Sequence, residues 1–468
     1  MRGSLSRESS KDYTNQRGKS TPEGTYYDRE LETMPWPKVQ RMTFDLLRDQ
    51  LANVYERSAW YRHRFDEAGV KPSDIRQPED LALIPFTEKD DERTSQDESP
   101  PFGGHLCVDE SEVVRVHASS GTTGRPTFFA LTKEDLRTWD VIMGRTFYMT
   151  GMRPGDRYAV LGNLSMFSGG VPAVTATASI GALGVPIGAQ AGTERTLELV
   201  KLLGVNIMGA TPSFAVHLSE VIKQVTGASA RDLNLKYLMV GGEPGGQLPS
   251  LRQQITEDWG CPIRDLMGIG EFAAACWGES EDASGMHFCG LPEVFIELID
   301  HDTGEVLAWE DGAEGEIVYS AVRREATPLI RFRSHDQVRV RMDEVPSGRT
   351  APRVTPIGRT DDMLLVRGIN VFPSAVRDIV GSFSPRTTGH LRIVLYKPGP
   401  LVEPPLPIEV EVSNSVAESD RAQLVQEITE NIRRSLTFNP DIRLVAEGSL
   451  ERTSLKTQFI REAFKEGS

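Results

Sequence analysis

Residues Ser119 to Pro126 read Ser-Ser-Gly-Thr-Thr-Gly-Arg-Pro, and these residue types together could bind a phosphate. Glycines let the backbone turn so that several N–H groups converge on one anion. The hydroxyl groups and the guanidinium group add side-chain donors for phosphate oxygens. The spacing differs from the Walker loop, which needs Gly-x-x-x-x-Gly-Lys, and a Ser/Thr/Gly linker would have a similar composition. The candidate phosphate-binding residues are Ser119, Ser120, Gly121, Thr122, Thr123, Gly124 and Arg125.

The elements around this loop predict an α/β fold. An apolar run at 113–116 precedes the loop, and a capped helix over Thr132–Phe147 follows it. From there to Leu298, short apolar strands alternate with helices, which is typical of a mostly parallel sheet with helices on both faces. The expected strands are 158–161, 184–187, 207–209, 237–240 and 294–298, and the further helices are 193–203, 213–225 and 250–259.

The pattern changes along the chain and predicts a division into domains. Residues 1–24 are polar and are expected to form a disordered tail. Residues 25–361 would form a large domain in which alternating segments at 316–319 and 337–340 indicate a β-rich subdomain. Residues 362–468 would form a small α+β domain, with strands at 391–396, 409–412 and 442–446 and an amphipathic helix at 420–436.

Composition excludes several classes of partner. The net charge of −15 argues against general binding to nucleic acid or to an anionic membrane surface. The uncharged segment 158–192 contains proline, asparagine and many small residues, so a buried α/β layer is expected rather than a membrane span. The 4 cysteines lack a disulfide spacing, which favours a cytoplasmic protein. A homodimer remains open.

Further motifs resemble the phenylacetate–CoA ligase-like branch of the adenylate-forming superfamily, which includes acyl-CoA synthetases, adenylation domains and luciferases. The segments beginning at Tyr27 and at Leu83 (Leu-Ile-Pro-Phe-Thr-Glu-Lys) look like that branch's helical N-terminal region. Ser119 to Pro126 matches its phosphate loop, although the family commonly has lysine where this chain has Arg125. A guanidinium group keeps the charge but is a planar fork, so loop geometry or turnover is expected to differ.

Two glycine-containing motifs follow predicted strands, where ligands of open α/β sheets bind. Either motif alone could be an ordinary turn. The resemblance implies that the first packs on adenine and that the second shapes the acyl pocket, with Glu271 helping to hold Mg²⁺ beside the triphosphate. The first motif is Gly241, Gly242, Glu243 and Pro244, and the second is Met267, Gly268, Ile269, Gly270 and Glu271.

The C-terminal third carries the motifs that the resemblance makes catalytic. Asp336 matches the aspartate that binds the ribose hydroxyls, and Arg359 would approach the phosphate or ribose. Asp361 matches the hinge about which the small domain turns, and Gly368 lies in the loop that reaches the site for the second reaction. Lys456 matches the catalytic lysine.

The acyl pocket and a metal site of some relatives are less well matched. By resemblance, Met166 and Phe167 face the acyl group, together with Gly241, and small residues nearby leave room for a flat ring. Many relatives hold zinc with a Cys and a His after the Glu271 motif and with Cys-Pro-Cys before the hinge. Here that second segment reads Val-Pro-Ser, so only three candidates remain and no zinc is expected. The candidates are Cys276, His287 and Cys289.

The resemblance implies an ATP-dependent ligase that converts a carboxylic acid to acyl-AMP and then to a coenzyme A thioester. Aryl or arylacetic acids are the preferred substrates, ATP and CoA are co-substrates, and Mg²⁺ is the cofactor. Two alternatives stay open: an adenylation enzyme that passes the acyl group to carrier-protein phosphopantetheine or an amine, and a non-catalytic ligand-binding descendant. Fold-level likeness alone does not choose between them.

Overall fold

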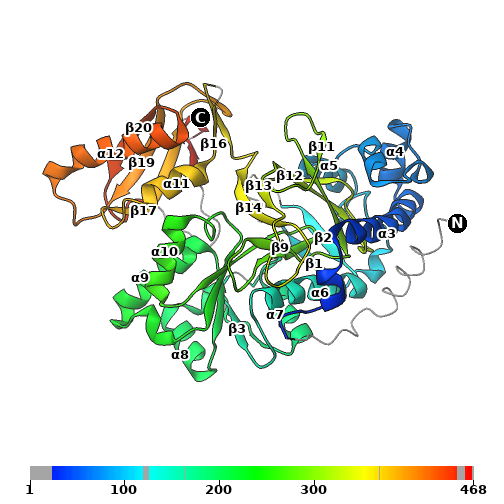
Figure 1. Cartoon of the computed structure of the whole chain (residues 1–468), viewed down its shortest axis with the longest axis horizontal. Helices are drawn as coiled ribbons and strands as arrows, with labels where there is room; N and C mark the ends of the chain where they lie inside the picture. The colour runs from blue at the N-terminus through cyan, green and yellow to red at the C-terminus, as the bar shows by residue number, and fades with distance from the viewer. Residues whose placement is uncertain (1–23, 120–125, 163, 368, 451–458, 466–468) are drawn as a thin grey trace. The chain divides into compact units, whose positions relative to one another are not determined.

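The computed structural model describes residues 24–119, 126–162, 164–367, 369–450 and 459–465 (Figure 1). The chain divides into two compact units. Unit 1 consists of Met1–Gly209, Arg264–Ser334 and Arg339–Thr355, and unit 2 consists of Ala210–Ile263, His335–Val338 and Pro356–Ser468. These units are defined by packing, so the functional division at Asp361 into a large and a small mobile domain stays a prediction.

The first helices of unit 1, α2 to α5, precede its first strand along the chain, and the others lie between its strands. Ser58 separates α3 from α4 within the span 42–61 that the sequence reads as helical, and its hydroxyl accepts from the Tyr61 N–H at 3.1 Å. Thr132 and Asp135 form a capping box that begins α6, as the sequence predicts. The helices are α2 (Arg29–Thr33), α3 (Trp36–Arg57), α4 (Ala59–Glu67), α5 (Lys89–Glu98), α6 (Lys133–Met149), α7 (Val171–Ala176) and α8 (Thr193–Leu202).

The strands of unit 1 include a parallel group and several antiparallel groups, which confirms the α/β class. β3 lies between β4 and β5 and is parallel to both, with Tyr158 opposite Gly184 and Ile207. β8 pairs antiparallel with β7 and β9, and β10 pairs antiparallel with β11 and β12. The strands wholly or mainly in unit 1 are β1 (Arg115–Ala118), β2 (Phe128–Leu131), β3 (Arg157–Val160), β4 (Leu183–Val185), β5 (Ile207–Ala210), β7 (Ile263–Ile269), β8 (Ala273–Glu279), β9 (Met286–Phe288), β10 (Val294–Ile299), β11 (Val306–Leu307) and β12 (Glu314–Ala321). Residues of β13 (Phe332–Arg341) and β14 (Arg353–Arg359) are divided between the two units.

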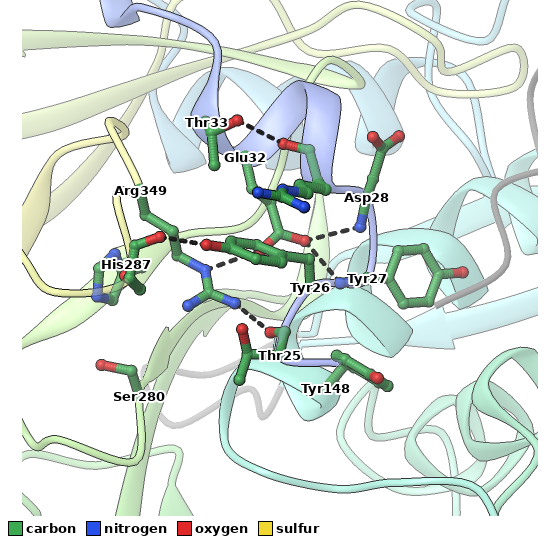
Figure 2. A network of polar contacts seen from close by, with 12 residues as sticks. Thr25, Tyr26, Tyr27, Asp28, Glu32, Thr33, Tyr148, Ser280, His287 and Arg349 are labelled. Atoms are coloured by element: carbon green, nitrogen blue, oxygen red, sulfur yellow. Dashed lines mark hydrogen bonds and ion pairs between the residues drawn. The ribbon is translucent and has the colours of Figure 1, made fainter. Parts of the chain in front are cut away.

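A buried ion pair anchors the first described residues (Figure 2). Glu32 accepts from the backbone N–H groups of Tyr27 and Asp28 at 2.9 and 2.8 Å. Its other oxygen accepts from Arg349 Nε at 2.8 Å, and Arg349 also donates to the carbonyl of Thr25. We call these residues the Glu32–Arg349 network. It joins the N-terminal segment to the loop before β14, far away in sequence.

Unit 2 contains a four-stranded C-terminal sheet among its described residues, in the order β20-β19-β17-β21. Its core includes Leu424, Ile428 and Ile432, which form the apolar stripe of α12, as predicted. The helices are α9 (Pro212–Thr226), α10 (Pro249–Trp259), α11 (Pro373–Gly381) and α12 (Glu418–Leu436). The strands are β6 (Tyr237–Gly241), β15 (Leu364–Val366), β16 (Ile369–Val371), β17 (Thr387–Leu395), β18 (Leu401–Val402), β19 (Leu406–Val412), β20 (Pro440–Val445) and β21 (Ile460–Glu462).

In the described parts of the chain, none of the helices combines the length and the apolar character needed to cross a bilayer. The uncharged segment 158–192 instead supplies β3, α7 and β4, which pack within unit 1. This agrees with the expectation of a buried α/β layer.

Candidate active site

The two ends of the predicted phosphate loop are held together by hydrogen bonds. Ser119 N–H donates to the carbonyl of Thr127 at 3.0 Å, and the Ser119 hydroxyl accepts from the Thr127 N–H at 3.0 Å. Residues 120–125, which include the other loop donors and Arg125, lie outside the described residues. β1 and β2 flank the loop as an antiparallel pair, with Ala118 opposite Phe128. The loop therefore belongs to a β-hairpin, and β2 separates it from α6, which the sequence analysis did not predict.

The predicted acyl loop lies against the end of β1. The carbonyl of Met166 accepts from Ala118 N–H at 2.9 Å and contacts His117 Nδ1 at 3.1 Å. The exposed fractions of Met166 and Phe167 are 44% and 39%, although both residues are apolar. An apolar loop that stays half exposed beside a candidate phosphate hairpin is suited to contact a bound organic acid.

His117 holds this loop and was not singled out from the sequence. Its ring stacks on Trp139 with centroids 5.7 Å apart, and the side chain is buried. Burial lowers the pKa of His117, so the ring is neutral near pH 7 and Nδ1–H donates to the Met166 carbonyl. The sequence signal is weak, because His117 is one of two polar residues in the short strand Arg-Val-His-Ala, a pattern that many ordinary strands share.

The Met267–Glu271 motif forms the last residues of β7 and the first residues of the turn to β8. Between Met267 and Ile269 the partner residue changes from Trp277 to Ala273, so the extra residues of this irregularity lie in β8, opposite Gly268. A Cβ at Gly270 would lie 3.1 Å from both the Phe129 ring and Ser168 Oγ, so a side chain there would press on β2 and on the acyl loop. Glycine at this position therefore lets Glu271 approach the base of the phosphate hairpin.

Glu271 forms a buried charge cluster with two residues of α5. Lys89 Nζ lies 3.1 Å from Glu92 Oε2 and forms a second ion pair with Glu271 Oε1. The exposed side-chain fractions are 22% for Lys89, 2% for Glu92 and 7% for Glu271. The Lys89 ammonium group also lies 5.1 Å from the centre of the Phe129 ring. We call these three charged residues the Lys89 cluster.

The pKa values in this cluster follow from its burial. Burial alone would lower the pKa of Lys89, but the carboxylates of Glu271 and Glu92 outweigh it and the pKa is raised. Burial raises the pKa of Glu92 to about 7, against the opposing effect of the Lys89 ammonium group. Lys89 is therefore cationic over the whole physiological range, and Glu92 is mostly ionised above about pH 7.

In unit 2, Arg359 joins two predicted site residues. Arg359 Nη1 donates to Asp336 Oδ1 at 3.0 Å, and Nε and Nη2 donate to the two oxygens of Asp361 at 2.9 and 2.7 Å. Burial opposes the charge of Arg359, but these two carboxylates outweigh burial and raise its pKa. The backbone holds the group together, because Thr360 N–H donates to the carbonyl of His335 at 2.8 Å. Gly368 and Lys456 lie outside the described residues.

The Gly241–Pro244 motif forms a turn after β6. Gly242 has φ of +86°, which favours glycine. Glu243 is turned into the protein, because its Oε1 accepts from the Ser213 N–H at 2.7 Å and from the Ser213 hydroxyl. This carboxylate therefore stabilises the N-terminus of α9. Any contact of the turn with adenine would use its backbone or Pro244 rather than this carboxylate oxygen.

Comparison with known families agrees with this arrangement. Residues 38–322 match the model of the AMP-binding enzyme family, and residues 368–463 match the AMP-binding enzyme C-terminal domain. This chain belongs to the AMP-binding enzyme family. Its relatives include the phenylacetate–coenzyme A ligases of Thermus thermophilus (34% identity, 89% of this chain and 94% of the relative) and Pseudomonas putida (32% identity, 91% and 94%). Within the family, the chain fits the phenylacetate–CoA ligase-like branch.

A solved structure of this family has the same fold over nearly the whole chain. A 2-hydroxyisobutyryl-CoA ligase in complex with 2-HIB-AMP superimposes with a TM-score of 0.87 at 29% identity, over 95% of this chain and 94% of that one. A benzoate CoA ligase from Burkholderia xenovorans shares the fold at 19% identity with a TM-score of 0.52. The α/β fold and the membership in an enzyme family of AMP-forming acid–thiol ligases are therefore established.

The donor set at Glu271 fits the Mg²⁺ ion that this family implies. Mg²⁺ prefers oxygen ligands and is commonly bound by one or two carboxylates together with substrate phosphates. Glu271 supplies such a carboxylate next to the phosphate hairpin, and Lys89 currently pairs with one of its oxygens. Glu92, on the far side of Lys89, was not identified from the sequence.

The residues considered for zinc are buried: Cys276 lies in β8, His287 lies in β9, and Cys289 directly follows β9. Cys289 N–H donates to the Cys276 carbonyl at 2.7 Å, and Cys289 Sγ lies 3.4 Å from the His287 carbonyl. Among the residues that the structure describes, no group of three or more His, Cys, Asp or Glu side chains is arranged to hold a metal ion. Burial raises the pKa of Cys289 to about 12, so it remains a neutral thiol.

Proposed function

We propose that this enzyme joins a carboxylic acid to coenzyme A in two steps, with ATP as the energy source. The observation that carries the proposal is coverage: both domains of the AMP-binding family are matched, and the phenylacetate–coenzyme A ligase of Thermus thermophilus aligns over 94% of its length.

In the first step, a substrate carboxylate oxygen attacks the α-phosphorus of ATP, the bond to the β-phosphate oxygen breaks, and pyrophosphate leaves. Two anions must approach each other, so cationic groups and N–H donors have to neutralise the phosphates. The hairpin loop at 119–126 would bind phosphate oxygens, and Arg359 and Lys456 would add positive charge. Mg²⁺ held by Glu271 supplies further charge neutralisation when it is bound.

Asp336 and Arg359 are suited to bind different parts of the nucleotide, the ribose and a phosphate. A carboxylate can accept from two adjacent ribose hydroxyls, and a guanidinium group can bind a phosphate through two parallel bonds. The Asp336–Arg359 ion pair at 3.0 Å would open or shift when the ribose binds. The Arg359 side chain is already oriented by Asp361, which limits the entropy that this change costs.

In the second step, the thiol sulfur of coenzyme A attacks the acyl carbon, the bond to the AMP oxygen breaks, and AMP leaves. The thiol proton passes to solvent or to a base. We propose that residues 362–468 turn about Asp361 between the steps and bring the loop at Gly368 to the thiol. Transfer to carrier-protein phosphopantetheine or to an amine would leave the adenylation step unchanged and replace only this acceptor.

The acyl substrate is proposed to be an aryl or arylacetic acid. The half-exposed Met166 and Phe167 offer an apolar surface next to the hairpin, and relatives in two organisms are named for phenylacetate. The 2-hydroxyisobutyryl-CoA ligase relative makes a small branched acid the main competitor. We place the enzyme in the cytoplasm, where its four buried free cysteines stay reduced, and sedimentation would distinguish a monomer from a homodimer.

A panel of acids tests this proposal in two assays. Pyrophosphate exchange into ATP reports adenylation, and thioester formation with CoA reports the second step. We expect arylacetic or aryl acids to give the highest kcat/KM in both assays. No exchange with any acid would overturn the ligase and leave only binding, and exchange without CoA-dependent product would favour a carrier-protein or amine acceptor.

Lys456→Ala separates the two steps. We expect it to reduce pyrophosphate exchange by at least about 100-fold, because one charge at the transition state is lost, and to spare thioester formation from supplied acyl-AMP. Lys465→Ala is the matched control: this nearby lysine is 65% exposed and pairs with Glu462, so both steps should be unaffected. Equal loss of both steps in Lys456→Ala would show that the assignment is wrong.

A further inference from the structure

Helix α5 contacts both halves of the candidate metal and phosphate site through successive turns. Lys89 lies at its first residue and binds Glu271, and Glu92 lies one turn later and binds Lys89. One turn further, Gln96 donates to the carbonyl of Phe128 at 2.8 Å and accepts from the Phe128 N–H at 3.0 Å. The helix is therefore tied to β2 of the phosphate hairpin at one point and to Glu271 at another.

Glu92 is buried, unlike the carboxylates of ordinary surface ion pairs. Its side chain is 2% exposed, and it faces inward, where the side chain of Thr127 at the base of the hairpin hydrogen-bonds it. Burying a carboxylate is costly unless it is paired with a cation. The Lys89–Glu271 pair is already neutral and does not need the Glu92 carboxylate for charge balance. For a purely structural role, an apolar or amide side chain at this position would cost less desolvation free energy than a carboxylate.

Charge balance gives this carboxylate a function. Lys89, Glu92 and Glu271 together carry one net negative charge when all three are ionised. Arg324 is a further buried cation whose charge acts on Glu92 and Glu271, and its own ion-pair partner Asp135, at 3.9 Å, offsets part of that charge. If Glu92 were neutral, Lys89 would neutralise Glu271 completely, and the attraction of the site for a divalent cation would fall.

We propose that Glu92 is a positioning residue that shares the Lys89 ammonium group with Glu271 and thereby keeps Glu271 available to Mg²⁺. The inference rests on the proposed function, because it takes Glu271 as the magnesium ligand. Glu92 touches neither substrate nor metal and acts through Lys89. Its substitution should therefore change the dependence of the enzyme on Mg²⁺ much more than the rate at saturating Mg²⁺.

The test compares Glu92→Gln with a control on the same helix. At pH 8 we expect Glu92→Gln to raise the Mg²⁺ concentration for half-maximal pyrophosphate exchange about tenfold, about 1.4 kcal/mol, with kcat at saturating Mg²⁺ within about twofold. Asp90→Asn removes the same charge two residues away, but Asp90 is 87% exposed and pairs with Arg93, so the Mg²⁺ dependence should not change.

A binding measurement makes the test independent of turnover. Mn²⁺ titrated into enzyme with ATP, followed by electron paramagnetic resonance, should bind about tenfold more weakly to Glu92→Gln than to wild type or Asp90→Asn. Equal Mn²⁺ affinity in all three would overturn the inference, even in an enzyme that shows normal exchange. Absence of exchange in wild type with normal Mn²⁺ binding would instead overturn the proposed ligase activity.

Glu92→Asp keeps the charge and serves as the conservative rescue. We expect its half-maximal Mg²⁺ concentration to stay within about threefold of wild type, because the ion pair with Lys89 can still form across a shorter side chain. Should Glu92→Gln fail to fold, as judged by thermal unfolding, Glu92→Asp still decides the matter. A tenfold loss of Mn²⁺ affinity in this charge-preserving variant would overturn the charge-sharing argument.

Discussion

Two of the buried clusters in unit 1 in which carboxylates meet a basic side chain, the Glu32–Arg349 network and the Lys89 cluster, differ in their charge balance. In the first, the Glu32 carboxylate pairs with the Arg349 guanidinium group, and each side chain is 6% exposed. The backbone N–H groups of Tyr27 and Asp28 donate to the other carboxylate oxygen (Figure 2). In the second, two carboxylates share one ammonium group. The first cluster is electrically neutral and internally satisfied, whereas the second carries one net negative charge when Glu92 is ionised.

This difference separates a structural ion pair from one prepared for a ligand. A neutral, fully hydrogen-bonded pair has nothing to gain from a cation and mainly joins distant segments. A cluster with unbalanced charge costs stability in the apo protein and recovers it when a cation binds. Perturbed pKa values alone would not distinguish the two, because structural ion pairs also perturb titration.

The largest expected effect is on stability. Arg349→Met should lower the free energy of unfolding by about 3–5 kcal/mol, because it leaves the Glu32 carboxylate buried without its cation. Urea denaturation followed by circular dichroism measures this. Arg195→Met is the control, since Arg195 is 59% exposed and pairs with Glu198, which is 60% exposed, and it should cost less than about 1 kcal/mol. A comparable loss in both variants would contradict the comparison.

A second prediction concerns pH and uses His287, which lies beside Arg349 (Figure 2). Burial, with a further effect of Arg349, lowers the pKa of His287 to about 3 from the usual histidine value of about 6.5. The unfolded chain therefore binds a proton below pH 6.5 that the folded chain does not bind. The contribution of His287 to the free energy of unfolding is therefore complete above pH 6.5. It decreases as the pH falls, by about 2 kcal/mol at pH 5.

His287→Leu should remove this part of the acid sensitivity. We expect the drop in unfolding free energy between pH 7 and pH 5 to be about 2 kcal/mol smaller than in wild type, measured by urea denaturation at both pH values. His63→Asn is the control, because His63 is 71% exposed, and its pH dependence should match wild type. An unchanged drop in His287→Leu would show that the ring is protonated in the folded state.

The smallest expected effect is on the stability of Glu92→Gln. Lys89 keeps its ion pair with Glu271 in this variant, so the free energy of unfolding should change by about 1 kcal/mol or less. Glu32→Gln makes the same chemical change in the Glu32–Arg349 network and leaves Arg349 buried without a counter-charge, so it should cost more. Its Mg²⁺ dependence should be that of wild type. If the two glutamine variants lost equal stability, the two clusters would not differ as proposed.

Most elements of secondary structure were predictable, because their signals are local. The stripe of α12 and the cap of α6 at Thr132 follow from side-chain periodicity and from one hydrogen-bonding residue. β2 was missed because Phe128–Leu131 is a short apolar run directly before a helix cap. It is a strand because it pairs with β1, and local sequence patterns do not specify that pairing.

The candidate site was predictable to the level of motifs and not of side-chain partners. The motif residues Asp336, Arg359 and Asp361 are joined as one ion-paired group, although sequence reasoning assigned them separate roles. Glu243 faces Ser213 and the start of α9, which its Gly-Gly-Glu-Pro context does not reveal. Partners of this kind lie far apart in the chain, so their pairing is decided by packing.

By itself, the sequence determined the order of elements, the family and the positions of its motifs, because periodicity, turn residues and spacing are properties of neighbouring residues. Only the tertiary structure decided that Lys89 and Glu92 accompany Glu271, which lies 182 positions after Lys89 in the chain. It likewise decided that Arg349 neutralises Glu32. The physical reason is that the energy of a charge depends on its burial and on the charges within a few ångströms, and both are set by folding.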